Sequence, residues 1–364
     1  MRLGPYAVTH ESVRGLLLSP YDSIGLRFSG IPRLPGETPE AIAREILRRN
    51  AHGVLYAGTG HFRFMWVSDF GKTLAGAKAA LPADYLRGLI ALMIGHSERM
   101  GHVASCFTPS RGFDMPYDRG DNLPWLLHCL TLCGLPDDLR PIVQNLLETW
   151  ESSHFERGLI SGRITGDWMD TLLRPSSTYN NVCALYALKC AARLGLKTKH
   201  SPDAMEEALL KSRWRGDRFT DYAGTEDWSV DAAVYALYFE VFDRKIREAA
   251  ADTLQASGLA EPYPIRCAPR DYDKKLMPFF TRLSPKYHSV IWLHLGFMYL
   301  NGLRKLGRDV AGPRAKLEAL IMEYRNVLET LEPNGKPYKT WLHSTEHGFS
   351  MASGQYLELI GAKS

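Results

Sequence analysis

The chain has 364 residues, of which 45% are hydrophobic and 23% charged, a composition typical of a folded globular protein and not of a disordered one. Its net charge is only +4, and lysines and arginines alternate with acidic residues, so it lacks the basic stripe that a nucleic-acid backbone requires. The N-terminus shows no signal-peptide pattern, no segment is apolar for long enough to span a bilayer, and none of the six cysteines forms a CxxC pair. We therefore expect a cytoplasmic protein that binds neither nucleic acid nor membrane.

Apolar periodicity and breaker residues predict a chain made almost entirely of helices. Prolines preceded by Thr or Ser mark two helix starts, at 38–39 and 201–202, and glycines mark several helix ends. The predicted helices cover residues 39–51, 69–81, 83–101, 121–134, 136–153, 176–195, 202–214, 229–242, 243–257, 285–307, 312–331 and 347–361.

These helices differ in polarity in an alternating manner. Helices such as 136–153 and 312–331 have one charged face and one apolar stripe, whereas helices such as 176–195 and 347–361 are apolar all round and rich in Ala, Gly, Ser and Cys. A helix with a charged face lies at the surface, and one that is apolar all round is buried. The sequence therefore predicts an all-α toroid of about twelve alternating inner and outer helices, formed by residues 39–364. Residues 1–38 are expected to be an N-terminal extension that packs on this single barrel domain.

The loops alternate in length as well. Connections from an inner to an outer helix are short, and those from an outer to an inner helix are long: 52–68, 102–120, 154–175, 215–228, 258–284 and 332–346. Because consecutive helices run antiparallel, all long loops fall at one end of the toroid, where the inner helices begin. Long ordered loops are usually functional, so this end is the predicted working face. The alternative is an open α-solenoid that binds a protein, although solenoids generally show a recognisable repeat and short loops on both sides.

The long loops are rich in Trp, Tyr, Phe, Arg, Asp and Glu. Aromatic rings stack on the C–H faces of sugars, and carboxylates and arginines form hydrogen bonds with hydroxyl groups. This mixture favours a small carbohydrate as the substrate. The sequence has no Gly-rich phosphate loop, no HExxH motif and no Cys/His cluster, so we expect neither a metal nor a cofactor.

Segments spread through the chain, taken in order, resemble the (α/α)6-barrel glycoside hydrolases, a group that includes processing α-glucosidases, glycogen-debranching glucosidases and neutral invertases. No single segment is specific, but the ordered set is. Two departures from many of these enzymes are noted: we expect no additional β-sandwich domain, and residues 287–292 do not contain the Gly-Trp-Pro elements. The segments are MWVSDFGKTLAG (65–76), YDRGDNLPWLLHCL (117–130), GDWMDTLLRP (166–175), YNNVCALYALKCAARLG (179–195), YHSVIWLHLGFMYLNGLRKLG (287–307), LETLEPNGKPY (328–338) and HGFSMASGQYLEL (347–359).

The resemblance implies hydrolysis with inversion, in which a carboxylic acid protonates the leaving oxygen and an opposing carboxylate activates water. It assigns the general acid to Asp170, whose pKa the neighbouring Trp168 and Asp167 would raise. The alternative role for Asp170 is a helix cap or a salt bridge within its loop. Three residues are candidates for the general base: Glu329, Glu332 and Glu346. The alternative for Glu329 is an exposed position near the C-terminal end of an outer helix, and the alternative for Glu346 is a helix cap.

The resemblance also implies a set of substrate-binding residues. Asp69 is expected to bind a sugar hydroxyl at the floor of the site, a role that is compatible with capping its own helix. For Trp292, an ordinary core position is the alternative. The other candidates are Trp66, Arg119, Asp121, Asp167, Trp168, Arg174, Tyr287 and His288.

Three functions remain open on the sequence alone. The first is an inverting glycoside hydrolase acting on a small, α-linked glucoside. The second is a sugar 2-epimerase type of isomerase, which shares the toroid but uses a histidine pair, for which His61, His288 and His347 are available. The third is a non-catalytic helical scaffold. Association into a homo-oligomer is compatible with each of them.

Overall fold

A computed structural model describes residues 2–3, 6–7, 24–26, 28–115, 118–169, 172–277, 282, 285–340 and 343–363. Between residues 39 and 359 of this part, each predicted helix corresponds to an observed one. The helices are α2 (Pro39–Asn50), α3 (Val67–Ala77), α4 (Ala83–Met100), α5 (Asn122–Cys133), α6 (Arg140–His154), α7 (Thr178–Arg193), α8 (Pro202–Arg213), α9 (Val230–Phe239), α10 (Arg244–Ala256), α11 (Leu293–Lys305), α12 (Ala311–Tyr324) and α13 (Ser350–Leu359).

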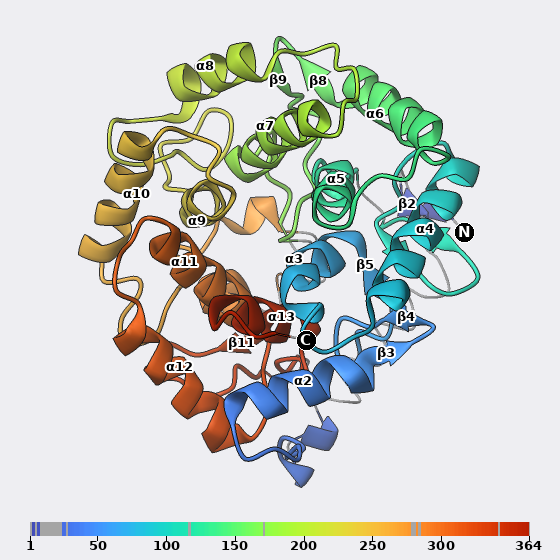
Figure 1. The fold of residues 1–364 in the computed structure, drawn as a ribbon. Helices are drawn as coiled ribbons and strands as arrows, with labels where there is room; N and C mark the ends of the chain where they lie inside the picture. The colour runs from blue at the N-terminus through green and yellow to red at the C-terminus, as the bar shows by residue number, and fades with distance from the viewer. Residues whose placement is uncertain are drawn as a thin grey trace.

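The helices form two concentric rings, with the odd-numbered helices inside and the even-numbered ones outside (Figure 1). Each inner helix packs against the next, and α13 packs against α3, so the inner ring is closed. Burial follows the predicted polarity: every residue of α9 is buried, whereas α10 buries only Ala250, Ala251 and Leu254. The predicted all-α toroid of the (α/α)6 type is thereby confirmed.

The ring closes through an unusually near approach of two inner helices. A Cβ atom added to Gly76 of α3 would overlap the carbonyl oxygen of Gly354 in α13, and one added to Gly354 would lie 2.5 Å from the carbonyl oxygen of Thr73. Glycine at both positions therefore lets the two backbones touch.

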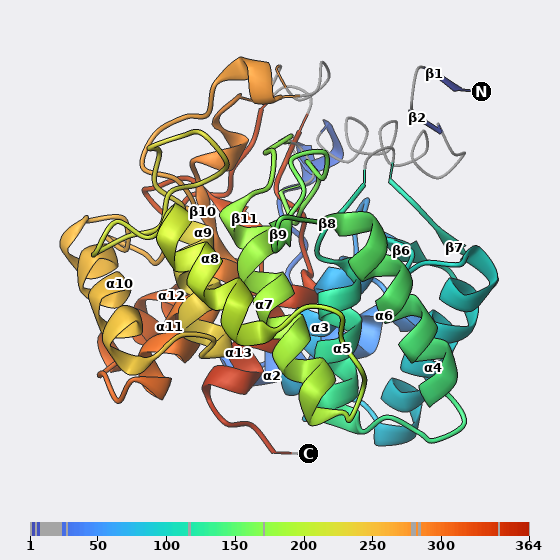
Figure 2. The ribbon, with the colours of Figure 1, turned by 90° about the horizontal axis from the view of Figure 1, so that it is seen from above.

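Segments of the loops pair with one another as short strands. They are β1 (Arg2–Leu3), β2 (Tyr6–Ala7), β3 (Ala51–His52), β4 (Val54–Leu55), β5 (Met65–Trp66), β6 (Cys106–Phe107), β7 (Gly112–Phe113), β8 (Phe155–Glu156), β9 (Leu159–Ile160), β10 (Ile291–Trp292) and β11 (Thr330–Leu331). All pairs are antiparallel: β1 with β2, β3 with β4, β5–β6–β7 as a three-stranded sheet, β8 with β9 and β10 with β11. In the view of Figure 2, the labelled strands lie towards the upper end of the barrel, which carries the long loops.

Two of the differences between predicted and observed helix bounds bear on the site. The helix predicted over 285–307 begins only at Leu293, because 285–288 form a 3-10 turn and 291–292 form β10. The helix predicted over 312–331 ends at Tyr324, where Arg325 adopts a left-handed conformation with φ of 46°. Pairing of β10 with β11 then places Glu329 next to a strand and not on an outer helix.

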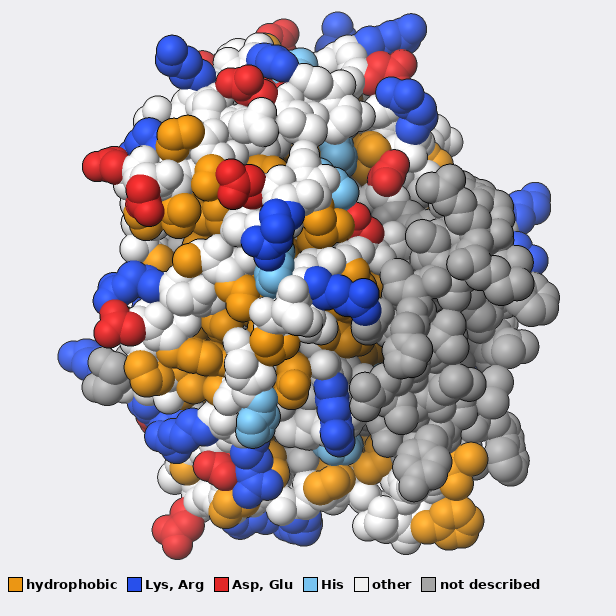
Figure 3. Space-filling view, turned by 90° about the vertical axis from the view of Figure 1, so that its right-hand side faces the viewer, with side chains coloured by type: hydrophobic (Ala, Val, Ile, Leu, Met, Phe, Trp, Pro, Cys, Tyr) orange, Lys and Arg blue, Asp and Glu red, His pale blue; other side chains and the backbone are white. Residues whose placement is uncertain are grey.

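The described part of the N-terminal segment contacts the barrel at the end of α12. The Leu34 N–H donates to the carbonyl of Arg325, and the Asn326 amide donates to the carbonyl of Pro32. On the face shown in Figure 3, basic and acidic side chains of the described residues are interspersed. Within the described ranges, the structure contains no helix with the length and apolarity needed to cross a membrane.

Candidate active site

A pocket opens at the end of the barrel where the long loops meet. Its empty volume is about 410 Å³, counting the part open to solvent. Its walls come from connecting loops and from the first turns of inner helices, which are far apart in sequence. The lining residues are Phe62, Trp66, Asp69, Lys72, Arg119, Trp168, Tyr287, Trp292, Glu329, Phe349 and Met351.

Asp69 lies in the first turn of α3 and lines the pocket. Burial raises its pKa, while the nearby cations Lys72 and Arg119 oppose this effect. Trp66, three residues earlier, carries the Arg119 guanidinium over its ring, 5.2 Å from the centroid. The pocket thus has, side by side, a carboxylate that can accept a hydrogen bond from a hydroxyl group and an aromatic ring.

Asp121 lies behind the pocket wall and holds Arg119. The guanidinium donates to both carboxylate oxygens of Asp121, from Nε and from Nη2, each at 3.0 Å. The Tyr179 hydroxyl donates to the same carboxylate at 2.9 Å. Burial alone would raise the pKa of Asp121, but Arg119 lowers it overall. Asp121 therefore orients Arg119 and does not itself line the pocket.

Arg174 is the centre of a fully buried cluster of charges. It forms ion pairs with Asp167 (2.8 Å), Asp221 (2.7 Å) and Asp231 (2.8 Å). Since three carboxylates share one cation in a buried site, burial and mutual repulsion raise the pKa of Asp167 to about 6 and that of Asp221 to about 7. Neither Arg174 nor Asp167 reaches the pocket, and both instead fix the loop in which they lie.

This cluster also positions one wall of the pocket. The indole N–H of Trp168 donates to Asp231 at 2.9 Å, and the Trp168 ring meets Trp292 edge-on with centroids 5.1 Å apart. Trp292 in turn donates to the carbonyl of Tyr287 at 3.2 Å. Three aromatic residues from two loops thus form a continuous wall, and Trp292 is both core and lining.

Glu329 is the candidate base that reaches the pocket. Its side chain is buried, with 3% exposure, and it accepts a hydrogen bond from the Tyr287 hydroxyl at 3.0 Å and a second from the Glu346 N–H at 3.3 Å. Burial, reinforced by the negative charge of Glu346 and opposed by His61, raises its pKa to about 8. Glu329 is therefore protonated near neutral pH in the free protein.

Glu346, the second candidate base, is fully buried behind Glu329. It forms an ion pair with His61 Nδ1 at 2.9 Å and accepts hydrogen bonds from the N–H groups of Gly60 and His61. A Cβ on either Gly58 or Gly60 would overlap its carboxyl group, so the loop is built around this side chain. Although burial opposes ionisation, His61 and these hydrogen bonds lower the pKa of Glu346 to about 2.

The remaining predicted residues lie away from the pocket or outside the described part. Glu332 is partly exposed on the turn after β11, where its N–H donates to the carbonyl of Lys336 at 2.7 Å. His288 is buried, its carbonyl accepts from the Cys267 thiol, and burial lowers its pKa to about 3. Asp170 lies outside the described residues, but Trp168, two positions earlier, lines the same pocket as Glu329.

Lys72 is the charged lining residue that the sequence analysis did not predict. It follows Asp69 by three positions on α3, which puts both side chains on one face of the helix. A lysine in an otherwise apolar inner helix was the available signal. The lining residues Phe62, Phe349 and Met351 were also not predicted. Among the described residues, no group of three or more His, Cys, Asp or Glu side chains could hold a metal ion.

No protein-family model and no curated protein matches this sequence. Solved structures do match it in fold, at low sequence identity. A glycosidase variant in complex with glucose aligns with a TM-score of 0.65 and 13% identity, over 90% of this chain and 97% of that one. The GH63 mannosylglycerate hydrolase of Thermus thermophilus aligns with a TM-score of 0.63 and 13% identity, over 88% and 100%.

This chain has the fold of these glycosidases. A rhamnosidase from Klebsiella oxytoca with bound rhamnose shares it as well, with a TM-score of 0.63 and 15% identity, over 92% of this chain and 66% of that one. At such identities the similarity establishes the toroid, and the chemistry has to be argued from the pocket itself.

Proposed function

We propose that this protein is a glycoside hydrolase that cleaves a small carbohydrate with inversion of the anomeric centre. The observation that carries the proposal is the convergence of Glu329, Asp69 and the Trp168 loop on one aromatic-walled pocket. Carboxyl groups and aromatic faces around a small hollow suit a polyhydroxylated ring. The fold shared with glycosidases is consistent with this chemistry.

For the catalytic pair, we assign Asp170 as the general acid and Glu329 as the general base. Of the three candidate bases, Glu329 lines the pocket, whereas Glu346 is held in an ion pair behind it and Glu332 lies on an outer turn. An inverting pair must stand roughly 6.5–9.5 Å apart to admit the attacking water. Since burial raises the pKa of Glu329 to about 8, its activity as a base should increase towards alkaline pH.

The substrate that we propose is a short α-linked glucoside, as processing α-glucosidases and related enzymes cleave. Asp69 would accept a hydrogen bond from a hydroxyl of the non-reducing sugar, and the Trp66 and Trp168 rings would flank that sugar. Similar structures hold glucose, or carry names that refer to mannosylglycerate or rhamnose. α-Mannosides and α-rhamnosides therefore belong beside α-glucosides in the first substrate panel.

The pocket favours hydrolysis over the histidine-dependent isomerase. Among the described lining residues there is no histidine. His61 is engaged by Glu346, His288 is buried elsewhere, and His347 forms a hydrogen bond with the Thr59 hydroxyl at 2.7 Å. A histidine pair facing a bound sugar is what the isomerase chemistry would need.

The test is to assay wild type, Asp170→Asn and Glu329→Gln on a panel of α-glucosides, α-mannosides and α-rhamnosides. Loss of either acid–base group should lower kcat about 10²- to 10⁴-fold. Glu332→Gln, which removes a carboxylate from an outer turn, is the matched control and should keep full activity. NMR of the first-formed product should show the inverted anomer.

Three outcomes would count against the proposal. Full activity of Asp170→Asn or Glu329→Gln would remove that residue from the catalytic pair. A product with retained configuration would exclude inversion. Epimer formation without hydrolysis would establish the isomerase instead.

A further inference from the structure

A buried lysine ammonium group without a hydrogen-bond partner faces the floor of the pocket. Lys72 is 0% exposed, lines the pocket, and its Nζ has no hydrogen-bond partner among the described residues. Buried polar groups in folded proteins are nearly always hydrogen-bonded, so each exception requires a reason. The proposed glycosidase chemistry, with its two carboxyl groups, gives Lys72 no role.

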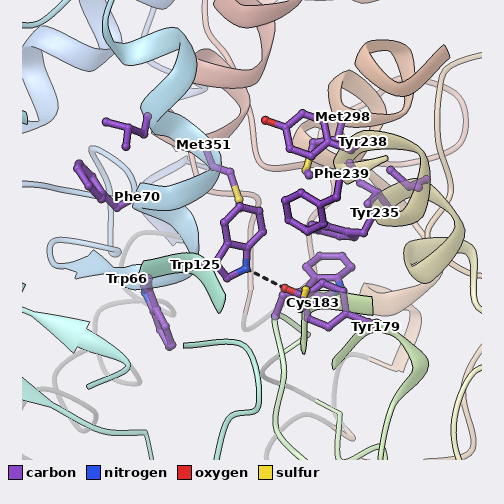
Figure 4. Packing of buried hydrophobic residues seen from close by; sticks show 14 of the residues in the cluster. Trp66, Phe70, Trp125, Tyr179, Cys183, Tyr235, Tyr238, Phe239, Met298 and Met351 are labelled. Atoms are coloured by element: carbon purple, nitrogen blue, oxygen red, sulfur yellow. Dashed lines mark hydrogen bonds between the residues drawn. The ribbon is translucent and has the colours of Figure 1, made fainter. Parts of the chain in front are cut away.

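The surroundings of Lys72 hold the cation in place but leave its donors unused. Its Nζ lies 5.3 Å from the ring centroid of Trp125, 5.5 Å from that of Trp168 and 5.8 Å from that of Tyr235. Figure 4 shows Trp125 and Tyr235 within the aromatic interior of the barrel. The ring faces attract a cation, but they do not replace the hydrogen bonds that an ammonium group makes in water.

Asp69 provides the complementary acceptor. Both residues belong to α3, line the same pocket and are three positions apart, on one face of the helix. Asp69 and then Asp121 are the carboxylates whose charges most strongly support the ionised form of Lys72 against burial. The floor of the pocket thus presents donors and an acceptor next to each other, with opposite charges that balance.

This arrangement matches two adjacent hydroxyl groups of an uncharged sugar. One hydroxyl donates to the Asp69 carboxylate, and a neighbouring oxygen accepts from the Lys72 ammonium group. A sugar carboxylate would gain from Lys72, but it would also lie beside the Asp69 carboxylate in a buried site, where like charges repel strongly. Arg119 compensates this repulsion little, because both Asp121 oxygens already accept from its guanidinium.

We propose that Lys72 is a specificity-determining residue that, paired with Asp69, selects an uncharged sugar with two adjacent hydroxyl groups over a uronate or a deoxy sugar at the pocket floor. This inference rests on the proposed function, because it deepens the recognition of the substrate by the same site. A purely structural role for Lys72 makes a different prediction: removal of the lysine would then alter stability and leave sugar selection unchanged.

The experiment compares wild type with Lys72→Met, which keeps the length of the side chain and removes the charge. Binding of D-glucose, D-mannose, D-glucuronate and the singly deoxygenated D-glucoses is measured by calorimetry, and KM is measured on the glycosides that wild type cleaves. Lys305→Met removes a lysine from α11 whose Nζ donates to the Tyr238 carbonyl, outside the pocket, and serves as the control.

We expect Lys72→Met to fold and to bind the preferred hexose about 10- to 100-fold more weakly, as for a lost hydrogen bond to a charged group. For one of the deoxy sugars, namely the one without the hydroxyl that Lys72 contacts, wild type and variant should bind equally. Lys305→Met should bind all sugars as wild type does. D-Glucuronate should bind wild type more weakly than D-glucose.

Equal hexose binding by Lys72→Met and wild type would overturn the inference, as would tighter binding of D-glucuronate than of D-glucose by wild type, or no monosaccharide binding by wild type. The two proposals fail separately. Hydrolysis with an unchanged KM in Lys72→Met would leave the glycosidase standing without this role for Lys72. Lysine-dependent hexose binding without hydrolysis of any glycoside would leave the role standing without the glycosidase.

Discussion

Replacing Glu329 with glutamine should change how protein stability depends on pH. Glu329 is buried, and its pKa is raised from an ordinary value of 4.5 to about 8. Glutamine has nearly the same shape and cannot ionise. Its carbonyl can still accept the hydrogen bond that the Tyr287 hydroxyl donates to Glu329.

The direction of the effect follows from proton binding. Between pH 4.5 and about 8 the folded protein keeps a proton on Glu329 that the unfolded chain releases, so stability decreases as pH rises through this interval. One pKa unit corresponds to about 1.4 kcal/mol, so this single group would cost up to about 5 kcal/mol at pH 8. Glu329→Gln avoids this cost, and its stability relative to wild type should therefore increase with pH.

The measurement is urea unfolding of wild type and Glu329→Gln at pH 5, 6, 7 and 8. A constant offset between the two proteins reports the new hydrogen bonds of the amide, for example opposite the Glu346 N–H. The change of that offset with pH reports the ionisation. Glu332→Gln, at a partly exposed position, should show no such change. If the offset stays constant from pH 5 to 8, Glu329 ionises in the ordinary range, and the reasoning from its burial is wrong.

Three further changes should each produce a distinct result. In wild type the Tyr287 hydroxyl donates to Glu329 and lowers the pKa of that carboxyl group. Tyr287→Phe removes this hydrogen bond, so the rise of kcat/KM towards alkaline pH should move to higher pH in a pH–rate profile. Arg174→Met leaves three buried carboxylates without their cation and should cost about 3–5 kcal/mol in urea unfolding; a loss below about 1 kcal/mol would contradict the role of the cluster. Gly76→Ala should lower the unfolding free energy by about 1–3 kcal/mol, because the added Cβ overlaps α13. Its control, Gly88→Ala, lies on the exposed face of α4 with no atom within 4 Å of the added Cβ, and it should raise the unfolding free energy by up to about 1 kcal/mol.

The helices and their arrangement could be predicted from the sequence because the signals are local. Thr38 and Ser201 were predicted as caps, and their side chains accept from the Ala41 and Ala204 N–H groups. The polarity of the helices alternates along the chain, and polar helices lie outside apolar ones, so this alternation predicts the two rings. The meeting of the long loops at one end follows from the antiparallel order of the helices, and residues of the loops after α2, α4, α6, α10 and α12 line one pocket.

The local signals failed where strand pairing ended a helix. Apolar periodicity continued through residues 312–331, but α12 ends at Tyr324, and β11 pairs with β10. The partner strand begins at Ile291, so no window around Glu329 contains the reason for the change. One proposed alternative for Glu329 was an exposed position near the end of an outer helix; the structure buries it instead.

The candidate site was predicted only in part. Trp66, Asp69, Arg119, Trp168, Tyr287, Trp292 and Glu329 line the pocket, whereas Asp121, Asp167, Arg174, His288, Glu332 and Glu346 do not. Sequence identifies which polar residues lie on the working loops. It does not reveal which of them face the pocket and which face one another.

That distinction depends on side chains from distant segments. Arg174 meets Asp221, 47 positions away, and Glu346 meets the backbone of His61, 285 positions away. Because of such pairing, residues that were candidates for binding a substrate instead hold the loops in place. Lys72 shows the opposite error: it was not predicted as a site residue, although its buried side chain lines the pocket.

The contact between α3 and α13 makes the order of synthesis matter. A ribosome produces α3 long before α13, so the inner ring stays open until α13 has emerged. Phe349 and Met351 belong to the pocket and arrive with that final helix. A nascent chain that stops before α13 therefore lacks both the closed inner ring and the part of the pocket that Phe349 and Met351 form.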